Sequence, residues 1–393
     1  MREAVILAAG EGRRLKPLTL SRPKVMLSIA GKPVLQYVIE ALAKNGVSNI
    51  ILVVGYHKEQ IFNHFGSGER FGVDITYITQ EKQLGTAHAL FQTREKVGES
   101  FLVLQGDKLI DAETIASFIQ VEPVALLTKR VENPQRYDRV VVSGGLLESI
   151  SIATEQKEGQ DNLVSTGVYA LSKAVFDFDA GELELPSVLG RMAAQGIKVK
   201  VYETDGTWLD VVYPWDILNI NDALLKKIPS EIGGTVESGV TFKKPVQVGR
   251  EGLLCAGSYI AGPVIVGERC HIGPHVCIMP SSSIGSNVVI SPFCLIKNSV
   301  IGDDVSIGPG SVIENSIIDR GCIIEGHFMA LSGKTEVKVE GGSELVEMGV
   351  VVGEGCHIGG NVVAQPGSII GNYCQVKAQR LLSGYLPDGS LVV

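Results

Sequence analysis

A loop near the N-terminus contains the first residues whose types and spacing could do chemistry. The run Leu7–Leu15 reads LAAGEGRRL, and Lys24 follows ten residues after Arg14. Small residues let the backbone approach a phosphate chain closely, and Arg14 and Lys24 supply charges that can neutralise it. The loop lacks both the Gly-Lys-Ser/Thr end of a Walker loop and the third glycine of the dinucleotide fingerprint. A phosphate-binding loop is one interpretation, and a structural glycine turn, the simpler one on these residues alone, is the other.

The elements that must position this loop follow an alternating pattern through about residue 225. Short β-rich runs alternate with stretches that carry apolar residues at helical spacing, which predicts an α/β fold. We expect strands at 4–8, 50–54, 75–79 and 101–104, and helices at 34–44, 59–65 and 86–96, with Pro33 at a first helical position. In a doubly wound, mostly parallel sheet, ligands bind at the carboxyl ends of the strands. This places Gly10, Gln80 and Asp107 at one edge of the sheet.

After residue 240 the helical pattern stops, and an aliphatic residue recurs every six positions, commonly followed by glycine. The recurring positions are 266, 272, 278, 284, 290 and 296, then 301, 307 and 313, and then 352, 358, 364, 370 and 376. A six-residue repeat of this kind is typical of a three-sided, left-handed parallel β-helix, with one inward residue for each flat side. Residues 325–350 break the period and are expected to form an excursion from the helix.

Two domains are therefore predicted, at residues 1–228 and 240–393, with an apolar helical segment at 214–229 between them. A chain of 393 residues is long enough for more than one domain. All seven cysteines lie beyond residue 250, without a CxxC pair, and buried thiols are expected.

Composition excludes several classes of function. The 35 Lys and Arg against 43 Asp and Glu give a net charge of −8, which argues against a protein that mainly coats nucleic acid. The longest run without charged residues, 270–296, contains Gly, Pro, Ser and Asn, so we expect no membrane span. A basic leader and a cleavage site are missing at the N-terminus, so a cytoplasmic location is expected.

Further motifs follow the loop in order, and together they resemble the sugar-1-phosphate nucleotidylyltransferases. They are the Pro-Lys at 23–24, the Gly-Lys-Pro at 31–33, Gln80 with 83–87, Gly-Asp at 106–107, Glu-Gln-Lys at 155–157, Thr-Gly-Val-Tyr at 166–169 and Trp-Leu-Asp at 208–210. The resemblance covers residues 1 to about 225. With the hexapeptide half, the whole chain resembles the bifunctional N-acetylglucosamine-1-phosphate uridylyltransferases, the glucose-1-phosphate thymidylyltransferases and their archaeal relatives.

This resemblance implies that a phosphate oxygen of a sugar 1-phosphate attacks the α-phosphorus of a nucleoside triphosphate and expels pyrophosphate. A phosphate monoester is already mostly dianionic, since its second pKa is ~6, so no general base is required. Arg14 and Lys24 would be the catalytic cations, and Asp107 and Asp210 would hold Mg²⁺. The nucleotide would contact Leu7, Ala9, Gly10, Gln80, Gly85 and Thr86. The segment around Gln80 favours UTP or dTTP over GTP.

The sugar phosphate would be held by Glu155, Lys157 and Thr166, with Glu155 accepting hydrogen bonds from sugar hydroxyls. A solvated surface charge is the alternative for both Glu155 and Lys157. Two positions depart from the family's pattern: Arg13 stands where Thr is common, and Asp138 where a Gly often approaches the sugar.

The second half resembles hexapeptide acyltransferases, which use a histidine as general base. His327, where the repeat breaks, is the first candidate, and acetyl-CoA would be needed only if the chain is bifunctional. The alternative is a β-helix that trimerises or regulates, because the basic, Asn-bearing stretch of the bifunctional enzymes is not recognisable. A non-catalytic scaffold subunit is the remaining hypothesis, although the charged set is intact. We expect a homo-oligomer, a trimer or a multiple of one.

Overall fold

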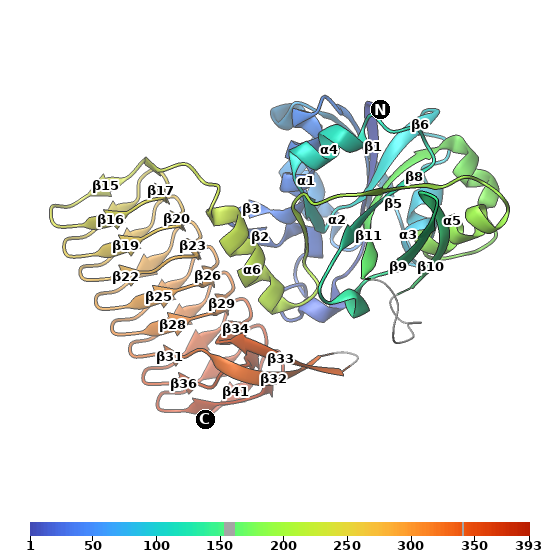
Figure 1. The fold of residues 1–393 in the computed structure, drawn as a ribbon. Helices are drawn as coiled ribbons and strands as arrows, with labels where there is room; N and C mark the ends of the chain where they lie inside the picture. The colour runs from blue at the N-terminus through green and yellow to red at the C-terminus, as the bar shows by residue number, and fades with distance from the viewer. Residues whose placement is uncertain (153–161, 340–341) are drawn as a thin grey trace. The chain divides into compact units, whose positions relative to one another are not determined.

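The computed structural model describes residues 1–152, 162–339 and 342–393 and divides the chain into two compact units (Figure 1). Unit 1 comprises residues 1–11, 22–26 and 33–210, and unit 2 comprises 12–21, 27–32 and 211–393. The units cross the domain limits expected near residues 228 and 240. Two short N-terminal segments and the helix that follows residue 213 pack with the C-terminal half, so chain order alone does not define the units.

Four strands of unit 1 form one continuous parallel part of a nine-stranded sheet. They are β1 (Glu3–Ala8), β4 (Asn49–Val54), β5 (Asp74–Thr79) and β6 (Ser100–Gln105). They lie in the order β5-β4-β1-β6, so the chain reverses direction beside β1 as in a doubly wound fold. All four predicted strands are confirmed.

The remaining strands make the sheet mixed, whereas the sequence predicted a mostly parallel one. They are β8 (Ala125–Arg130), β9 (Arg139–Ser143), β10 (Leu146–Ser151), β11 (Leu163–Ser172) and β12 (Lys200–Glu203). Strand β11 runs antiparallel to both β6 and β8. Strands β9 and β10 form a hairpin whose turn residues, Gly144 and Gly145, have φ values of 58° and 79°, as a two-residue hairpin turn requires.

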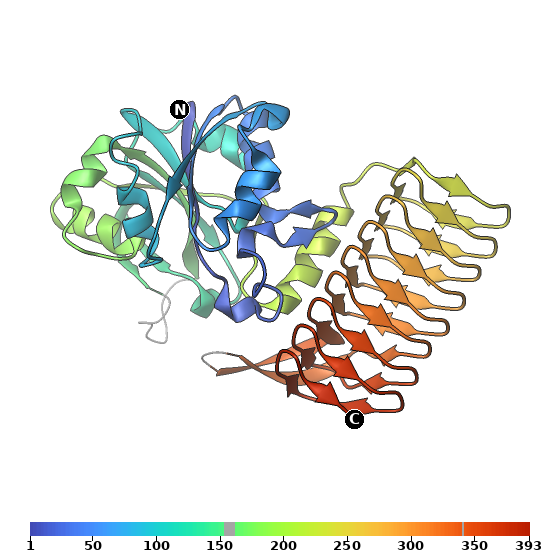
Figure 2. The same ribbon diagram turned by 180° about the vertical axis from the view of Figure 1, so that it is seen from behind.

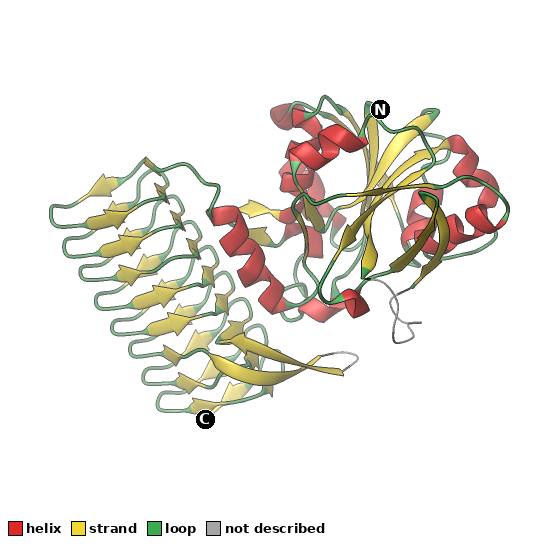
Figure 3. Cartoon of the chain, viewed as in Figure 1, coloured by secondary structure: helices red, strands yellow, loops and turns green. Residues whose placement is uncertain are grey.

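Helices of unit 1 flank the sheet (Figure 3). They are α1 (Val34–Lys44), α2 (Lys58–Phe65), α3 (Thr86–Phe91), α4 (Ala112–Phe118) and α5 (Leu185–Ala194), with 3-10 turns at Lys24–Met26, Glu69–Phe71, Pro134–Arg136 and Lys173–Phe178. Pro33 is the residue before α1 rather than its first residue, and α3 ends at Phe91, earlier than predicted. Helix α1 buries an apolar face that includes Leu35, Val38 and Leu42, as its residue spacing predicts.

Unit 2 is a left-handed parallel β-helix with the helix α6 (Pro214–Leu225), the 3-10 turn Arg13–Leu15 and the strands β2 (Ser28–Ile29) and β3 (Lys32–Pro33), the last of which ends in unit 1. Its first sheet contains β14 (Glu231–Ile232), β17 (Val246–Val248), β20 (Val264–Val266), β23 (Ser282–Ile284), β26 (Val300–Ile301), β29 (Ile317–Ile318), β34 (Val350–Val352), β37 (Ser368–Ile370) and β40 (Tyr385–Leu386). The second sheet contains β15 (Thr235–Val236), β18 (Leu253–Leu254), β21 (His271–Ile272), β24 (Val289–Ile290), β27 (Ser306–Ile307), β30 (Ile323–Ile324), β35 (His357–Ile358), β38 (Gln375–Val376) and β41 (Leu391–Val392). The third sheet contains β16 (Thr241–Lys243), β19 (Tyr259–Ala261), β22 (Cys277–Ile278), β25 (Leu295–Lys297), β28 (Val312–Glu314), β31 (Met329–Ala330), β36 (Val363–Ala364) and β39 (Leu381–Leu382).

The six-residue period is confirmed as the inward position of each strand. Ile272, Ile278 and Ile290 are fully buried in one continuous apolar core. The break in the six-residue spacing between positions 296 and 301 corresponds to a shorter coil, since Ile284 pairs with Ile301, seventeen positions on, while Val266 pairs with Ile284, eighteen on. Six of the seven cysteines are buried, and all are free. Burial raises the pKa of the Cys294 thiol, which donates to the Gly308 carbonyl at 3.2 Å.

The excursion predicted at 325–350 is an antiparallel hairpin inserted between two coils (Figure 2). It is shorter than predicted, because β31 (Met329–Ala330) is still a regular strand of the β-helix. Strands β32 (Gly333–Val339) and β33 (Gly342–Met348) form it. Val337 is 4% exposed, while Lys334, Glu336 and Lys338 are exposed, so alternate residues of β32 lie on an inner and an outer face of the hairpin. The hairpin lies between β31 and β34 in the chain, and the stack of coils resumes after it without loss of register.

Helix α6 is held in unit 2 by a fully buried asparagine. Asn221 Oδ1 accepts from the Ala30 amide at 3.0 Å and from the Ser283 hydroxyl at 2.5 Å, and its Nδ2 donates to the Ser281 carbonyl at 2.8 Å. One side chain thus joins α6, the turn after β2 and a coil of the β-helix. Such a network is stabilising only because each buried polar group finds a partner.

Among the residues that the structure describes, the helices are all too short or too polar to span a membrane.

The core of the β-helix gives a matched test of its inward and outward positions. On β24, Ile290 is fully buried, whereas its neighbour Val289 is 43% exposed. We expect Ile290→Ala to destabilise the β-helix by roughly 2–5 kcal/mol, because it removes buried methyl groups and leaves a cavity. Val289→Ala is expected to cost well under about 1 kcal/mol. Urea unfolding followed by far-UV circular dichroism measures both, and equal destabilisation would contradict the assigned register.

Candidate active site

A short antiparallel pairing brings two distant motifs together. Strand β7 (Lys108–Ile110) follows the end of β6, and β13 (Trp208–Asp210) pairs with it, placing Asp210 opposite Lys108. Asp107 directly precedes β7. The two aspartates predicted as metal ligands are therefore brought to the same place by main-chain hydrogen bonds, although a hundred residues separate them in the sequence.

Two lysines lie against these aspartates. Lys24 Nζ lies 2.5 Å from Asp107 Oδ2 and 3.8 Å from Asp210 Oδ1, and Lys108 Nζ lies 3.8 Å from Asp210 Oδ2. The exposed fractions of the side chains are 16% for Lys24, 23% for Asp107 and 7% for Asp210. Because charges this poorly solvated interact more strongly than surface charges, the four side chains form a compact alternation of positive and negative groups.

The electrostatic environment keeps Asp107 ionised. Burial by itself would raise the pKa of this carboxyl, but the ammonium groups of Lys24 and Lys108 and the hydrogen bond from Lys24 outweigh it and lower the pKa. A carboxylate that is charged at neutral pH is what a cation requires of a ligand.

The carboxylates fit a magnesium ion. Asp210 Oδ1 is buried and accepts no hydrogen bond from the residues that the structure describes, leaving an acceptor for a cation or a donor group. Mg²⁺ is commonly bound by one or two carboxylates together with substrate phosphates. Within the same described part of the chain, no cluster of three or more His, Cys, Asp or Glu side chains could hold a metal ion by protein groups alone.

Trp208 fixes the start of β13 against the neighbouring strand β11. Its indole Nε1 donates to the Thr166 carbonyl at 2.9 Å, and its ring meets Tyr137 edge to face. Thr166 itself is fully buried, and its hydroxyl donates to the Leu127 carbonyl at 2.8 Å. We therefore retain for Thr166, predicted as a sugar-phosphate contact, only a main-chain role. Gly167 follows with φ at +77°, and a Cβ there would lie 3.2 Å from Lys108 Nζ.

The segment predicted to contact the nucleotide base is tied to the start of α5. Gln80 is 3% exposed, and its Nε2 donates to the Gly85 carbonyl at 3.1 Å. Thr86 Oγ1 donates to Glu184 at 2.7 Å and accepts from the Leu185 amide at 2.8 Å. Gln80 and Gly85 are thus brought together, and Gln80 lies directly after the carboxyl end of β5, as the sequence predicted.

The first strand ends where the phosphate loop begins. The Leu7 carbonyl accepts from the Gly106 amide at 2.9 Å, and the Ala9 carbonyl accepts from the Tyr56 amide at 3.2 Å. Leu7 and Ala9 are buried, whereas Gly10 is exposed, and a Cβ at Gly10 would meet nothing within 4 Å. The structure therefore leaves Gly10 as the accessible residue of the three. Arg14, in the part of the loop that belongs to unit 2, is exposed.

Three predicted site residues remain. Glu155 and Lys157 fall outside the residues that the structure describes. His327 is an exposed corner residue of the β-helix with φ at 60°, and its ring lies over Gly310. Sequence reasoning missed Lys108 and Glu184 as members of the site. Lys108 carries a detectable signal, since it follows Asp107 directly, but nothing in the sequence links Glu184 to Thr86.

The comparisons with known proteins agree with this fold, which is that of an α/β enzyme joined to a hexapeptide-repeat β-helix. Residues 3–227 match the nucleotidyl transferase family model, and residues 260–335 match the GMPPB C-terminal domain. The chain therefore belongs to the nucleotidyl transferase family. This confirms the resemblance read from the motifs.

Individual relatives extend the match to the whole chain. The bifunctional protein GlmU of Methanocaldococcus jannaschii is 31% identical over 99% of this chain and 97% of its own length. The bifunctional sugar-1-phosphate nucleotidylyltransferase/acetyltransferase of Sulfurisphaera tokodaii is 30% identical over 73% of each chain. A solved structure assigned as a glucose-1-phosphate thymidylyltransferase of Bacillus anthracis aligns with a TM-score of 0.52 and 26% identity, over 57% of this chain and 96% of that one.

The lowered pKa of Asp107 predicts an acid-dependent contribution to stability. A carboxyl whose pKa is depressed by folding stabilises the protein above its unfolded pKa of about 3.9, and this stabilisation is lost as pH falls through the lower folded value. The advantage of the wild type over Asp107→Asn in thermal unfolding is expected to be constant above about pH 5 and to shrink below about pH 4. Asp205→Asn, at an exposed position, is the control. An advantage that grows on acidification would contradict the assignment.

Proposed function

We propose that the protein transfers a nucleotidyl group from UTP or dTTP to a sugar 1-phosphate, with Mg²⁺, giving a pyrimidine nucleotide sugar and pyrophosphate. The observation that carries this proposal is the convergence of Lys24, Asp107 and Asp210 at the carboxyl edge of the sheet. The names of the relatives support the sugar 1-phosphate as acceptor.

The chemistry needs positioning and charge neutralisation. A phosphate oxygen of the sugar 1-phosphate forms a bond to the α-phosphorus, and the bond from that phosphorus to the oxygen bridging the α- and β-phosphates breaks, releasing pyrophosphate. The attacking phosphate is already ionised, so no residue has to remove a proton. Lys24 supplies positive charge where the two anions approach, and Arg14 neutralises the leaving pyrophosphate.

Asp107 and Asp210 would hold the magnesium ion. When bound, Mg²⁺ supplies positive charge that screens the phosphates and stabilises the charge of the transition state. Lys24 would then have two roles. Its ammonium group lies against both carboxylates, and the same group would contact phosphate oxygens of the substrates. Its positive charge lowers the pKa of Asp107 and so keeps that carboxyl ionised and competent to bind the metal.

Substrate selection is assigned to the two flanks of this centre. Gln80, Gly85 and Thr86 would contact the base, with Gln80 held by its hydrogen bond to the Gly85 carbonyl. Glu155 and Lys157 would hold the sugar phosphate, and Asp138 would restrict which sugars fit. The Ser165 amide donates to the Asp138 carbonyl at 2.9 Å, so Asp138 is fixed to β11 beside Thr166.

Acetyl transfer in the β-helix is the second candidate. It is favoured by the relative named bifunctional that aligns over 97% of its length. His327 would be the general base, with acetyl-CoA as donor, and the exposed lysines Lys334 and Lys338 of the neighbouring hairpin would contact phosphates. We also propose a homo-oligomer, a trimer or a multiple of one, because the flat sides of a β-helix favour threefold association.

The nucleotidyl transfer is tested by pyrophosphate release with Mg²⁺. Five nucleoside triphosphates are combined with the 1-phosphates of glucose, N-acetylglucosamine, galactose and mannose. Turnover is expected with UTP or dTTP and one or more of these sugars. Asp107→Ala and Asp210→Ala are each expected to lower kcat by at least about 100-fold, because removing one electrostatic partner of the transition state has effects of that order.

Asp74→Ala is the matched control, since Asp74 is an exposed aspartate at the opposite end of β5. It is expected to leave kcat unchanged. Folded wild-type protein that releases no pyrophosphate with any pair would refute the proposed function and favour the scaffold hypothesis.

The acetyl transfer is tested separately. Coenzyme A release is measured with acetyl-CoA and glucosamine 1-phosphate, in the wild type and in His327→Ala. If His327 is the base, we expect release by the wild type and a loss of about 100-fold or more in the variant, as for a removed general base. If the wild type is active in nucleotidyl transfer but releases no coenzyme A, the acetyl-transfer proposal is refuted.

A further inference from the structure

The segment that carries Arg14 is folded with the β-helix. Residues 12–21 belong to unit 2, and they form a compact series of turns closed by the Thr19 hydroxyl, which donates to the Gly12 carbonyl at 2.8 Å. Leu15 and Leu18 are 0% and 2% exposed, whereas Arg14 is exposed. We call residues 12–21 the arginine loop. Its fold directs Leu15 and Leu18 inward and leaves Arg13 and Arg14 exposed.

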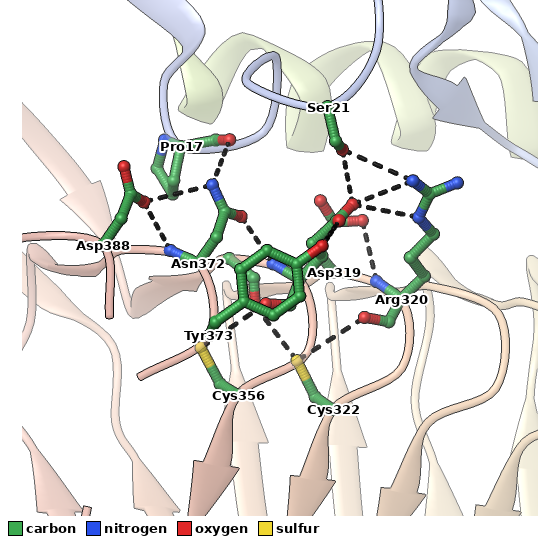
Figure 4. Close-up of polar contacts among 11 residues, drawn as sticks. Pro17, Ser21, Asp319, Arg320, Cys322, Cys356, Asn372, Tyr373 and Asp388 are labelled. Carbon is green, nitrogen blue, oxygen red and sulfur yellow. Dashed lines mark hydrogen bonds and ion pairs between the residues drawn. The ribbon is translucent and has the colours of Figure 1, made fainter. Parts of the chain in front are cut away.

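A buried carboxylate of the β-helix binds the end of this loop (Figure 4). The Ser21 hydroxyl donates to Glu354 Oε2 at 2.5 Å. Arg320 Nε donates to the same oxygen at 3.0 Å, and the Tyr373 hydroxyl donates to Glu354 Oε1. Glu354 is only 5% exposed. Burial would raise the pKa of this carboxyl, but its bonds to Ser21, Tyr373 and Arg320 lower it, so the loop binds a charged group.

A second buried residue binds the middle of the loop. Asn372, 1% exposed, donates from Nδ2 to the Pro17 carbonyl at 3.1 Å. The same amide group donates to Asp388 Oδ1 at 3.1 Å, and Asn372 Oδ1 accepts from the Glu354 amide at 2.7 Å. The two anchors are therefore linked to each other. They bind the loop at Pro17 and Ser21, three and seven residues after Arg14.

These anchors occupy one position of the repeat. Arg320, Glu354 and Asn372 are each the second residue after a strand of the first sheet, on three successive coils. Glu268 has the same position after β20, but it is half exposed and pairs with its neighbour Arg269. The difference between Glu354 and Glu268 shows that the corner itself does not require a buried carboxylate, since the same fold is made with an exposed one.

We propose that Glu354 and Asn372 are positioning residues for nucleotidyl transfer: they hold the arginine loop in the conformation that presents Arg14. This inference rests on the function proposed above for Arg14. A cationic side chain stabilises a leaving group only from a fixed place, and displacements of about 1 Å can cost 100-fold in rate. The β-helix thus contributes to the reaction of the other half of the chain, in addition to any activity of its own.

The anchoring is tested by hydrogen exchange, which does not depend on activity. Within the loop, the amides of Leu15, Leu18 and Leu20 are hydrogen-bonded to loop carbonyls. Glu354→Ala and Ser21→Ala are expected to speed their exchange by at least about tenfold, as loss of a buried charged hydrogen bond does. Glu268→Ala is the matched control and is expected to leave it unchanged. Unchanged exchange in both loop-contact variants would overturn the proposal.

The functional consequence is tested by a double-mutant cycle with Arg14. In the wild-type background, Glu354→Ala and Ser21→Ala are each expected to lower kcat about tenfold or more, with a smaller change in KM for the sugar phosphate. In the Arg14→Ala background the same substitutions are expected to have little further effect, because the residue that they position is gone. A merely structural role would lower activity equally in both backgrounds, which would overturn the proposal.

The two measurements separate this inference from the proposed function. Faster exchange with unchanged kcat in an active enzyme overturns the positioning role alone. A wild type that releases no pyrophosphate overturns the proposed function, and the positioning role falls with it, while hydrogen exchange still decides whether Glu354 anchors the loop. The Glu354→Gln variant keeps an acceptor for Ser21 and is expected to retain more activity than Glu354→Ala.

Discussion

The antiparallel pairing of β7 with β13 is the constraint on which the candidate site depends. Its register sets Asp210 opposite Lys108 and next to Asp107, so main-chain hydrogen bonds, rather than the flexible side chains themselves, fix the distance between the two carboxylates. Trp208 holds the same short strand against β11 through its bond to the Thr166 carbonyl. With the backbone fixed in this way, Lys24 reaches both acids, and like charges that would repel are compensated by ammonium groups at short range.

In unit 2, buried polar side chains fix the positions of segments that apolar contacts alone would not fix. Asn221 joins α6, the turn after β2 and a coil of the β-helix, and Glu354 and Asn372 join the arginine loop to two successive corners. Hydrogen bonds have directions, so they specify one arrangement, whereas apolar surfaces of similar area can slide. The cost of burying these groups is offset only while every partner is in place, which makes the junctions specific.

Periodic patterns in the sequence predicted most of the fold. The parts that they did not predict depend on contacts between segments far apart in the chain. The six-residue repeat located the inward residues of the β-helix, including the shorter coil after Ile284, because burial recurs at a fixed spacing. The four parallel strands followed from their apolar runs. The antiparallel position of β11 could not be read, since strand pairing is decided by tertiary contacts that leave no local pattern.

In the candidate site, too, the sequence predicted some features and tertiary contacts determine the others. The resemblance to the sugar-1-phosphate nucleotidylyltransferases indicated Asp107, Asp210 and Lys24, and their residue types suit phosphates and a divalent cation. The structure adds that Lys24 lies against both aspartates and that the Thr166 hydroxyl is used within the fold. Neither fact follows from the sequence, because the first depends on a backbone pairing between residues far apart and the second on which side chains face the interior.

The repeat pattern also explains why the anchors of the arginine loop escape sequence analysis. The β-helix constrains its inward positions, where Ile, Val and Ala recur, but the second residue after each strand of the first sheet faces outward at a corner. At that position the chain places Glu268, Arg320, Glu354 and Asn372 on different coils without disturbing the core. Corners that the fold leaves unconstrained are thus free to carry specific contacts. Single residues of a periodic scaffold can therefore acquire a positioning role. The six-residue pattern identifies the scaffold, but it does not identify these residues, because they lie outside the repeated positions.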